Sequence, residues 1–206
     1  DIGCALLAGS TLFVEPPGLL SPGPHFLDLL KERNITHMDV PPSLLKTIPS
    51  DQPPSSLQTI IIGGEACAPD VVRTWASKCL VVNVYGPTEA TVCTSLGACD
   101  SKTWERPLIG QPLANVDYFI LDENQKPVAQ GCPGELYIGG VQLAKGYVDE
   151  PELTARKFVE IDGMRLYRTG DLILRCEDGE YQFLGRVDRQ FKLRGMLVEP
   201  EEIEAK

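Results

Sequence analysis

Residues that could bind a nucleotide follow two neighbouring apolar segments of the chain. Residues 83–91 (NVYGPTEAT) come directly after one of them and bring an aromatic ring, hydroxyls and a carboxylate close together. Tyr85 offers a face on which a base can stack, Thr88 a hydroxyl for a phosphate, and Glu89 a hard oxygen ligand for Mg²⁺. Residues 63–65 (GGE) end the other segment, where a backbone without side chains lets a flat ring approach closely.

Two further clusters lie in the C-terminal half. Residues 166–172 (LYRTGDL) place Asp171 after a Thr-Gly pair, which predicts a turn. A carboxylate held there could accept hydrogen bonds from both hydroxyls of a ribose, although a turn aspartate that caps its own backbone is the simpler interpretation. Residues 185–195 (GRVDRQFKLRG) contain four cations within nine residues, which in isolation predicts a solvated surface.

The first half of the chain must position the first cluster, and its pattern alternates between helices and strands. It predicts helices at residues 1–8, 25–33, 43–48 and 70–78, and strands at residues 10–14, 35–40, 57–62 and 80–84. This alternation indicates a parallel sheet covered by helices. Ligands of such sheets bind at the carboxyl ends of the strands, which is where residues 63–65 and 83–91 lie.

The second half must position the other clusters, and there the pattern changes to short strands separated by turns. From about Gly110 it predicts strands at residues 117–121, 135–138, 171–175 and 181–184, one helix at 151–159 and the start of another at 200–206. Hairpins of this kind indicate a small antiparallel barrel or a distorted sheet. The predicted fold class is therefore α/β, with a parallel αβ subdomain followed by an antiparallel β-barrel-like subdomain.

Composition and charge argue against several classes of protein. The 29 acidic residues outnumber the 19 basic ones and give a formal net charge of −10, a poor match for a nucleic-acid-binding protein. No apolar stretch approaches the roughly 20 residues that span a membrane. The 7 cysteines have no C-x-x-C spacing, so neither a disulfide framework nor a zinc site is supported. Reduced cysteines favour a cytoplasmic protein.

Taken together, several blocks resemble the adenylation domains of nonribosomal peptide synthetases: NVYGPTEAT, GELYIGGVQLAKGY, PELTARKF, YRTGDL, GRVDRQFKLRG and VEPEEIE. These domains belong to the adenylate-forming superfamily, with acyl-CoA synthetases and firefly luciferase. The resemblance implies a ligase that uses ATP and Mg²⁺ to activate an amino acid as aminoacyl-AMP, releasing pyrophosphate. It also implies transfer of the aminoacyl group to the phosphopantetheine thiol of a carrier (thiolation) domain, among neighbouring synthetase domains.

By this resemblance the chain divides into three parts. Residues 1–107 match part of the second αβ subdomain of the family's large N-terminal domain, residues 108–187 its β-rich subdomain, and residues 188–206 the hinge and the start of a mobile C-terminal α+β subdomain. The family's phosphate loop, its substrate-amine aspartate and its C-terminal catalytic lysine are not among these residues. The chain is therefore expected to be a piece truncated at both ends and inactive alone.

The resemblance also implies which residues bind the nucleotide. They are Gly64, Glu65 and Ala66 beside the adenine, Asn83 and Tyr85 lining it, and Gly86, Thr88, Asp171, Phe183 and Arg186 elsewhere in the site. Thr88 touches the α-phosphate, Asp171 binds the ribose hydroxyls, and Arg186 reaches the ribose–phosphate side. Phe183 stands where some members of the family have tyrosine, so stacking there loses only a hydroxyl.

Three more roles follow from the resemblance. Glu89 helps to hold Mg²⁺ and is implied in catalysis together with Thr88. Asp188 is the hinge about which the C-terminal subdomain turns between adenylation and thioester formation. Lys192 follows the hinge and serves the thioester-forming half reaction.

The family's substrate pocket aligns with six residues, Asp39, Ile61, Gly63, Val84, Val92 and Cys93. All but Asp39 are small or apolar, and Gly63 predicts a deep pocket. A carboxylate in an apolar cleft is unfavourable unless it is paired, so Asp39 predicts a basic substrate side chain, as in ornithine, lysine or an arginine-like residue. Alternatively, Asp39 caps the Pro41-Pro42 turn or bonds a backbone N–H, and the pocket takes a polar or apolar amino acid.

Two other functions stay open at this point. An acyl- or aryl-CoA ligase would use the same adenylating chemistry, although residues 134–147 and 151–158 favour the peptide-synthetase branch. A non-catalytic nucleotide-binding or scaffold module would need neither the phosphate loop nor the catalytic lysine. A domain inserted after Ala205 would also agree with the family pattern.

Overall fold

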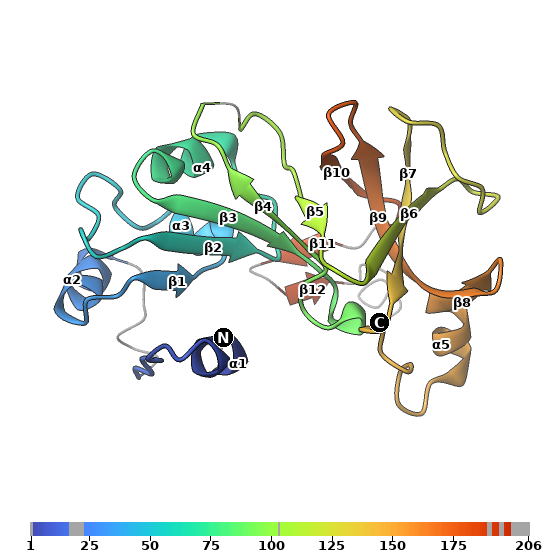
Figure 1. The fold of residues 1–206 in the computed structure, drawn as a ribbon, viewed down its shortest axis with the longest axis horizontal. Coiled ribbons are helices and arrows are strands. Elements are labelled where there is room, and N and C mark those ends of the chain that lie inside the picture. The colour runs from blue at the N-terminus through green and yellow to red at the C-terminus, as the bar shows by residue number, and fades with distance from the viewer. Residues whose placement is uncertain (1, 17–22, 103, 189–190, 194–195, 199–206) are drawn as a thin grey trace.

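The structure is a computed structural model that describes residues 2–16, 23–102, 104–188, 191–193 and 196–198. Its strands form two larger sheets, here named sheet A and sheet B, and a small two-stranded ribbon. Figure 1 shows sheet A (blue to green) on one side of the molecule and sheet B (yellow to orange) on the other. The α/β fold class predicted from the sequence is confirmed.

Sheet A carries the parallel strands. In spatial order it contains β1 (His37–Asp39), β2 (Thr59–Gly63), β3 (Leu80–Tyr85), β4 (Ser95–Cys99) and β5 (Gln111–Pro112). The first three strands are parallel, whereas β4 and β5 join antiparallel. The register sets Asp39 beside Ile61 and Gly63 beside Val84. The carboxyl ends of β1, β2 and β3 therefore meet at one edge of the sheet.

The helices of this half are short, and several begin with proline. They are α1 (Ile2–Leu7), α2 (Pro24–Glu32), α3 (Pro42–Leu45), α4 (Pro69–Ala76) and the 3₁₀ helix η2 (Thr88–Ala90). Proline suits a first turn because its φ is preset and its missing N–H would have no partner there. Val72 and Trp75 of α4 are almost fully buried in one core with Ile60, Ile62 and Val81 of sheet A. Burial of this apolar face fixes α4 on the sheet.

Sheet B is antiparallel throughout, with the strand order β10–β9–β7–β6 and β8 paired to β9. Its elements are β6 (Val116–Leu121), β7 (Pro133–Gly140), α5 (Pro151–Lys157), β8 (Phe158–Ile161), β9 (Met164–Arg175) and β10 (Tyr181–Arg186). Ala90 and Ile109 pack with Leu136, Ile138 and Ile173 in a second core, which joins the two halves. The ribbon of β11 (Phe191–Leu193) and β12 (Met196–Val198) follows.

Within the described residues, sheet B stays open because β6 and β10 lie at opposite ends of its strand order. Irregular register interrupts the pairing of β9 with both β7 and β10. Of the two predicted forms, the distorted sheet is found and the closed barrel is not. The subdomain boundaries 1–107, 108–187 and 188–206 stay a prediction.

Some individual elements differ from the sequence prediction. Residues 10–14 form no strand; Phe13 and Val14 are exposed, and the described residues offer them no partner strand. Strand β4 was not predicted, since its sequence SLGAC has little β-branched or aromatic character. The predicted helix 151–159 ends at Lys157, after which the chain extends into β8.

Two more predictions concern the ends and the turn of the C-terminal half. The turn expected before Asp171 lies inside the long strand β9, and the helix expected at residues 200–206 falls outside the described residues.

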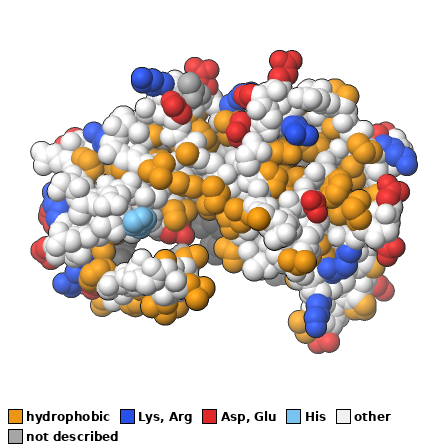
Figure 2. All heavy atoms as spheres, in the orientation of Figure 1, with side chains coloured by type: hydrophobic (Ala, Val, Ile, Leu, Met, Phe, Trp, Pro, Cys, Tyr) orange, Lys and Arg blue, Asp and Glu red, His pale blue; other side chains and the backbone are white. Residues whose placement is uncertain are grey.

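No helix in the described ranges combines the length and the apolar character needed to cross a membrane. Helix α1 buries none of its side chains, and Figure 2 shows hydrophobic side chains exposed along it.

Candidate functional site

A cavity of about 580 Å³ lies where the ends of β2 and β3 meet residues of β9 and β10. Nine of the ten residues predicted to bind a nucleotide line it: Gly64, Glu65, Ala66, Asn83, Tyr85, Gly86, Asp171, Phe183 and Arg186. The exception is Thr88, which is exposed and lies on η2, just beyond the turn at Gly86. The fold thus gathers three separate clusters of the sequence around one space.

Backbone without side chains forms part of the cavity wall. A Cβ on Gly86 would lie 2.5 Å from the carbonyl oxygen of Val92, so the sharp turn after β3 requires glycine. Gly64 has a φ of 79° and open space where a side chain would stand. Between them, Asn83 is fixed by the hydrogen bond that its Nδ2 donates to the carbonyl oxygen of Leu108 at 2.6 Å. A flat ring could approach this wall closely.

Asp171 is a buried carboxylate with a hydrogen-bond donor on each oxygen. Tyr85 Oη donates a short hydrogen bond to Oδ2, and Arg186 Nη1 donates to Oδ1 at 2.8 Å. Burial and the neighbouring charge of Asp171 raise the pKa of Tyr85 well above its ordinary value, so the phenol remains a donor. The carboxylate is thereby held in one orientation, as recognition of a diol requires.

Arg186 connects Asp171 to the residue predicted to be the hinge. Its Nε and Nη2 donate to the two oxygens of Asp188 at 2.6 and 2.7 Å. Burial alone would lower the pKa of Arg186, but the hydrogen bond to Asp188 and the charges of both aspartates raise it. The guanidinium therefore stays charged and bridges two carboxylates. Lys192 lies on β11, and its side chain is outside the described part of the chain.

A bulge in β9, rather than a turn, presents Asp171 to the cavity. Gly170 has a φ of 79°, which glycine adopts readily. The buried carboxylate of Glu135 on β7 accepts the Gly170 N–H at 3.1 Å and Arg168 Nε at 2.9 Å, which fixes the bulge. Neither Glu135 nor Arg168 was predicted as a site residue from the sequence. The signal existed, since both belong to the GELYIGG and YRTGDL blocks, but only the strand pairing shows that they meet.

Glu89 lies on η2 and contacts the loop that follows β7. Its Oε1 accepts a hydrogen bond from Tyr147 Oη at 2.6 Å, and its carbonyl oxygen accepts the Ala144 N–H at 2.8 Å. Burial and the charge of Glu89 raise the pKa of Tyr167, which places this second tyrosine beside the carboxylate. Among the described residues, no cluster of three or more His, Cys, Asp or Glu side chains could hold a metal. A lone carboxylate suits Mg²⁺, which keeps several waters and shares substrate phosphates.

The predicted substrate-pocket residues lie mainly on the carboxyl ends of the parallel strands. Asp39 and Ile61 are neighbours across β1 and β2, as are Gly63 and Val84 across β2 and β3. Burial raises the pKa of Cys93, and the charge of Asp39 contributes, so these two groups lie near one another. Of the six, Val84 alone also lines the cavity described above.

Two of the six have surroundings that the pattern did not indicate. A Cβ on Gly63 would lie 2.6 Å from the carbonyl oxygen of Val84, so the close approach of β3 leaves no room for a side chain at this position. Val92 is 80% exposed. Both Thr91 and Val92 have a positive φ, which is strained for β-branched residues. The loop after η2 therefore holds Val92 out toward solvent.

No residue in the described part of the chain forms a hydrogen bond or a short ion pair with the carboxylate of Asp39. Partial burial raises its pKa. Helix α3 begins at Pro42 without a side-chain cap, so Asp39 does not cap the Pro41-Pro42 turn. The carboxylate is available to a ligand.

Trp104 lines the cavity although no sequence pattern led us to expect it there. It is 4% exposed, and its carbonyl oxygen accepts Arg73 Nη1 at 2.9 Å. Its indole Nε1 and Glu65 Oε1 are both buried without a hydrogen-bond partner among the described residues. Unpaired buried polar atoms are unfavourable and mark places that water or a ligand completes. No local pattern around residue 104 could have revealed this position.

The chain matches the sequence family described as "AMP-binding enzyme" over residues 1–148. It is 46% identical to a linear gramicidin synthase of Brevibacillus parabrevis over 209 residues, which cover 100% of this chain and 3% of that protein. It is 43% identical to bacitracin synthase 3 of Bacillus licheniformis, with 99% of this chain and 3% of that protein covered.

Solved structures show the same fold. The crystal structure of IdnL1 superposes with a TM-score of 0.89 at 29% identity, covering 98% of this chain and 44% of that chain. NpsA-ThdA, an artificially fused adenylation–PCP di-domain from Klebsiella oxytoca, superposes with a TM-score of 0.84 at 28% identity, covering 98% and 42%. The chain thus spans less than half of each solved structure and a few per cent of the two synthases.

Proposed function

The chain belongs to the family of AMP-binding enzymes, and on that premise we propose that it forms the nucleotide-binding part of an adenylation domain in a nonribosomal peptide synthetase. In the proposed reaction the carboxylate of an amino acid attacks the α-phosphorus of ATP, and pyrophosphate leaves. The aminoacyl group then passes from AMP to the phosphopantetheine thiol of a carrier domain. The observation that carries the proposal is the convergence of the three sequence clusters on one cavity.

Different residues around the cavity suit different parts of the nucleotide. The bare backbone at Gly64 and the ring of Tyr85 suit a flat adenine. Asp171, fixed by Tyr85 and Arg186, suits the two ribose hydroxyls. Thr88 on η2, just after the turn at Gly86, suits the α-phosphate.

The metal would act at the phosphate end of this pose. Glu89 fits Mg²⁺ because its carboxylate has acceptor capacity beyond the bond from Tyr147. When bound, Mg²⁺ would offset the negative charge that develops on the phosphates. Asp188 is the proposed hinge, supported by its tie to Arg186, and Lys192 is proposed to serve the second half reaction.

The unpaired carboxylate of Asp39 supports a substrate with a basic side chain. An ammonium or guanidinium group would supply the partner that the chain does not. The proposed partners are therefore this amino acid, a carrier domain and the neighbouring synthetase domains. All seven cysteines are free, which supports a reducing compartment such as the cytoplasm.

The test is pyrophosphate exchange into ATP by the full-length protein, with a panel of basic, polar, apolar, aryl and fatty acids. Exchange that depends on an amino acid, led by a basic one, is expected. Exchange that depends on an aryl or fatty acid, with thioester formation on CoA, would instead identify a CoA ligase. Nucleotide binding without exchange on any acid would identify a non-catalytic module. The 206 residues alone are expected to give no exchange.

A further inference from the structure

The loop between β7 and α5 is docked on η2 by a series of hydrogen bonds. Tyr147 Oη donates to Glu89 Oε1 at 2.6 Å, and Ala144 N donates to the Glu89 carbonyl oxygen at 2.8 Å. Thr91 Oγ1 donates to the carbonyl oxygen of Gln142 at 2.6 Å. Both the carboxylate and the backbone of Glu89 are therefore fixed by residues that lie more than 50 positions later in the chain.

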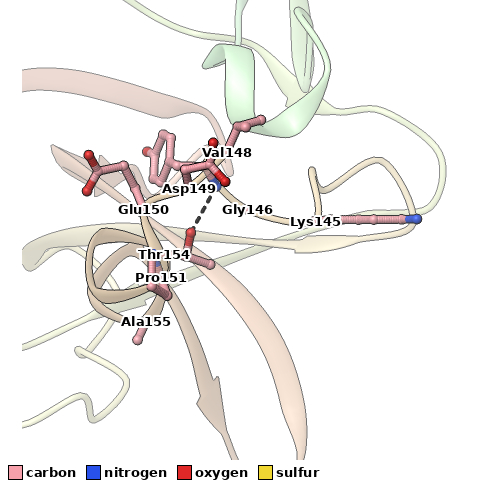
Figure 3. A pocket seen from close by; sticks show the side chains of 9 residues that line it. Lys145, Gly146, Val148, Asp149, Glu150, Pro151, Thr154 and Ala155 are labelled. Carbon is pink, nitrogen blue, oxygen red and sulfur yellow. Dashed lines mark hydrogen bonds between the residues drawn. The ribbon is translucent and has the colours of Figure 1, made fainter.

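Tyr147 is itself held from two sides. Its N–H donates to Thr154 Oγ1 of α5 at 2.8 Å, the bond drawn as a dashed line in Figure 3. Gly146 makes room for this contact, since a Cβ there would lie 2.5 Å from Thr154 Cγ2. The ring of Tyr147 packs edge-on against Phe158 with centroids 5.8 Å apart.

Phe158 is in turn fixed by its own neighbours. Its ring lies 5.1 Å from that of Tyr167, and the guanidinium of Arg165 sits 4.5 Å above its centroid. Arg165 Nη2 also donates to the carbonyl oxygens of Ala144 and Lys145 at 2.7 and 2.9 Å. The phenol of Tyr147 thus belongs to a rigid cluster, and few alternative positions are open to it.

We propose that Tyr147 is a positioning residue whose hydroxyl holds the Glu89 carboxylate in the orientation that receives the metal, with Thr154 and Phe158 holding Tyr147 for that purpose. The inference rests on the proposed role of Glu89 toward Mg²⁺. It gives the GELYIGGVQLAKGY and PELTARKF blocks a task, since Tyr147 ends the first, and Thr154 and Phe158 belong to the second. A ligand held by an outer hydrogen bond loses less freedom when the metal binds.

The test measures metal binding directly, with Mn²⁺ as the probe. The full-length protein is saturated with a non-hydrolysable ATP analogue, and the free Mn²⁺ is followed by electron paramagnetic resonance. Tyr147→Phe should weaken Mn²⁺ binding about tenfold, the usual effect of losing an outer partner of a metal ligand. The affinity for the analogue in EDTA should not change, because the nucleotide cavity is left intact.

Tyr118→Phe is the matched control. It removes a tyrosine hydroxyl that also makes a 2.6 Å hydrogen bond, but to Thr94 instead of Glu89. Both Mn²⁺ binding and analogue binding should be unchanged in this variant. If Tyr147→Phe does not fold, Thr154→Val replaces it, because this variant removes the side-chain hydroxyl that accepts the Tyr147 N–H. It should also weaken Mn²⁺ binding, but by less than Tyr147→Phe.

Glu89→Gln separates failure of the inference from failure of the proposed function. It should weaken Mn²⁺ binding at least as much as Tyr147→Phe, and the double variant should lose no more than Glu89→Gln alone. If Glu89→Gln weakens Mn²⁺ binding and Tyr147→Phe does not, the inference is overturned while the role of Glu89 stands. If neither variant has an effect, both fail. An equal loss of analogue binding with and without metal would reduce Tyr147 to a structural contact and also overturn the inference.

Discussion

Sheet A meets the proposed nucleotide cavity mainly with backbone and uncharged side chains, whereas sheet B meets it with charges. The ends of β2 and β3 contribute Gly64, Asn83, Tyr85 and Gly86. Strands β9 and β10 contribute Asp171 and Arg186, which form a salt bridge at 2.8 Å, along with Phe183. The first sheet therefore provides shape and the second provides electrostatics.

The two contributions are maintained by different forces. The end of β3 is fixed by tight backbone packing and by an apolar core that holds Ile62 and Val81 fully buried. Asp171 is fixed by hydrogen bonds: Tyr85 and Arg186 hold its carboxylate, and Glu135 holds the bulge before it. Hydrogen bonds to charged groups contribute about 1.5–3 kcal/mol each when buried. Changes in sheet B should therefore alter ligand affinity more sharply than equally small changes in sheet A.

The largest effect is expected for Asp171→Ala in the full-length protein. The variant removes the charged acceptor for the ribose, and one charged hydrogen bond of about 1.5–3 kcal/mol corresponds to a KM for ATP roughly 10 to 100 times higher. Exchange kinetics at varied ATP measure it. Asp122→Ala is the control, because Asp122 Oδ1 accepts only the backbone N–H groups of Asn124 and Lys126 in a surface turn. An unchanged KM in Asp171→Ala would show that Asp171 does not bind the ribose.

Glu65 already brings one charge to the cavity from the end of β2, and Asp39 would add another at the end of β1, so Asp39 challenges the contrast between the sheets. If it pairs with a basic substrate, Asp39→Ala should lower kcat/KM for that substrate about two- to fivefold. The effect is kept modest because Asp39 is exposed and water screens the pair. A neutral analogue of equal length should be affected less. A hydrophobic preferred substrate, or an unaltered ranking of substrates in the variant, would return sheet A to a purely steric role.

A smaller effect is expected from Gly170→Ala, which strains the bulge that presents Asp171. The φ of 79° disfavours alanine by about 1–2 kcal/mol. The new Cβ would also lie 2.5 Å from Arg186 Nη2 and 2.9 Å from Asp188 Oδ2. Thermal unfolding should show a lower Tm, and KM for ATP should rise a few-fold, as roughly 1 kcal/mol of lost binding implies.

Gly131→Ala is the control that separates the effect of steric crowding at Gly170 from the effect of backbone strain. Gly131 has nearly the same φ, 80°, but open space where the Cβ would stand. Its variant should lose stability through φ alone and keep the wild-type KM for ATP. Equal KM values in the two variants would show that the bulge does not control Asp171.

Sheet A was largely predictable because its signals are local. The apolar runs in β2 and β3, the glycines after them and the Gly-Pro turn all lie within short windows, and parallel strands align their carboxyl ends by topology. The missed β4 is the exception, since antiparallel pairing with β3 compensates for a weak local propensity. In sheet B, the sequence predicted β6, β7, β10 and the end of β9, but not β8 or the start of β9. The bulge at Gly170 was not predicted either. It depends on Glu135, which meets Gly170 only across the β7–β9 pair.

The site shows the same division. Many residues that line the cavity could be named from the resemblance, because Asn83, Tyr85, Asp171 and Arg186 belong to recognisable blocks. The residues that orient them, such as Glu135 and Tyr147, could not, because a hydrogen bond across 58 positions leaves no trace in spacing. The position of Trp104 in the cavity wall could not be predicted for another reason. Its neighbours in sequence form no pattern, and its place in the wall follows from the path of the chain between β4 and β5.

A final contrast concerns thiol reactivity and compares the two halves of the molecule without any substitution. Cys67 lines the cavity at the end of β2, where burial and the charge of Asp70 raise its pKa to about 11. Cys132 is exposed before β7. Because the thiolate is the reactive form, iodoacetamide at pH 8 should alkylate Cys132 about tenfold faster or more. Peptide mass spectrometry of the full-length protein measures both rates, and urea should make them converge.

Saturating ATP should slow the alkylation of Cys67 further and leave that of Cys132 unchanged, since of these two thiols only Cys67 borders the proposed nucleotide. Similar rates in the folded protein, or equal protection of both thiols by ATP, would contradict this assignment of the cavity.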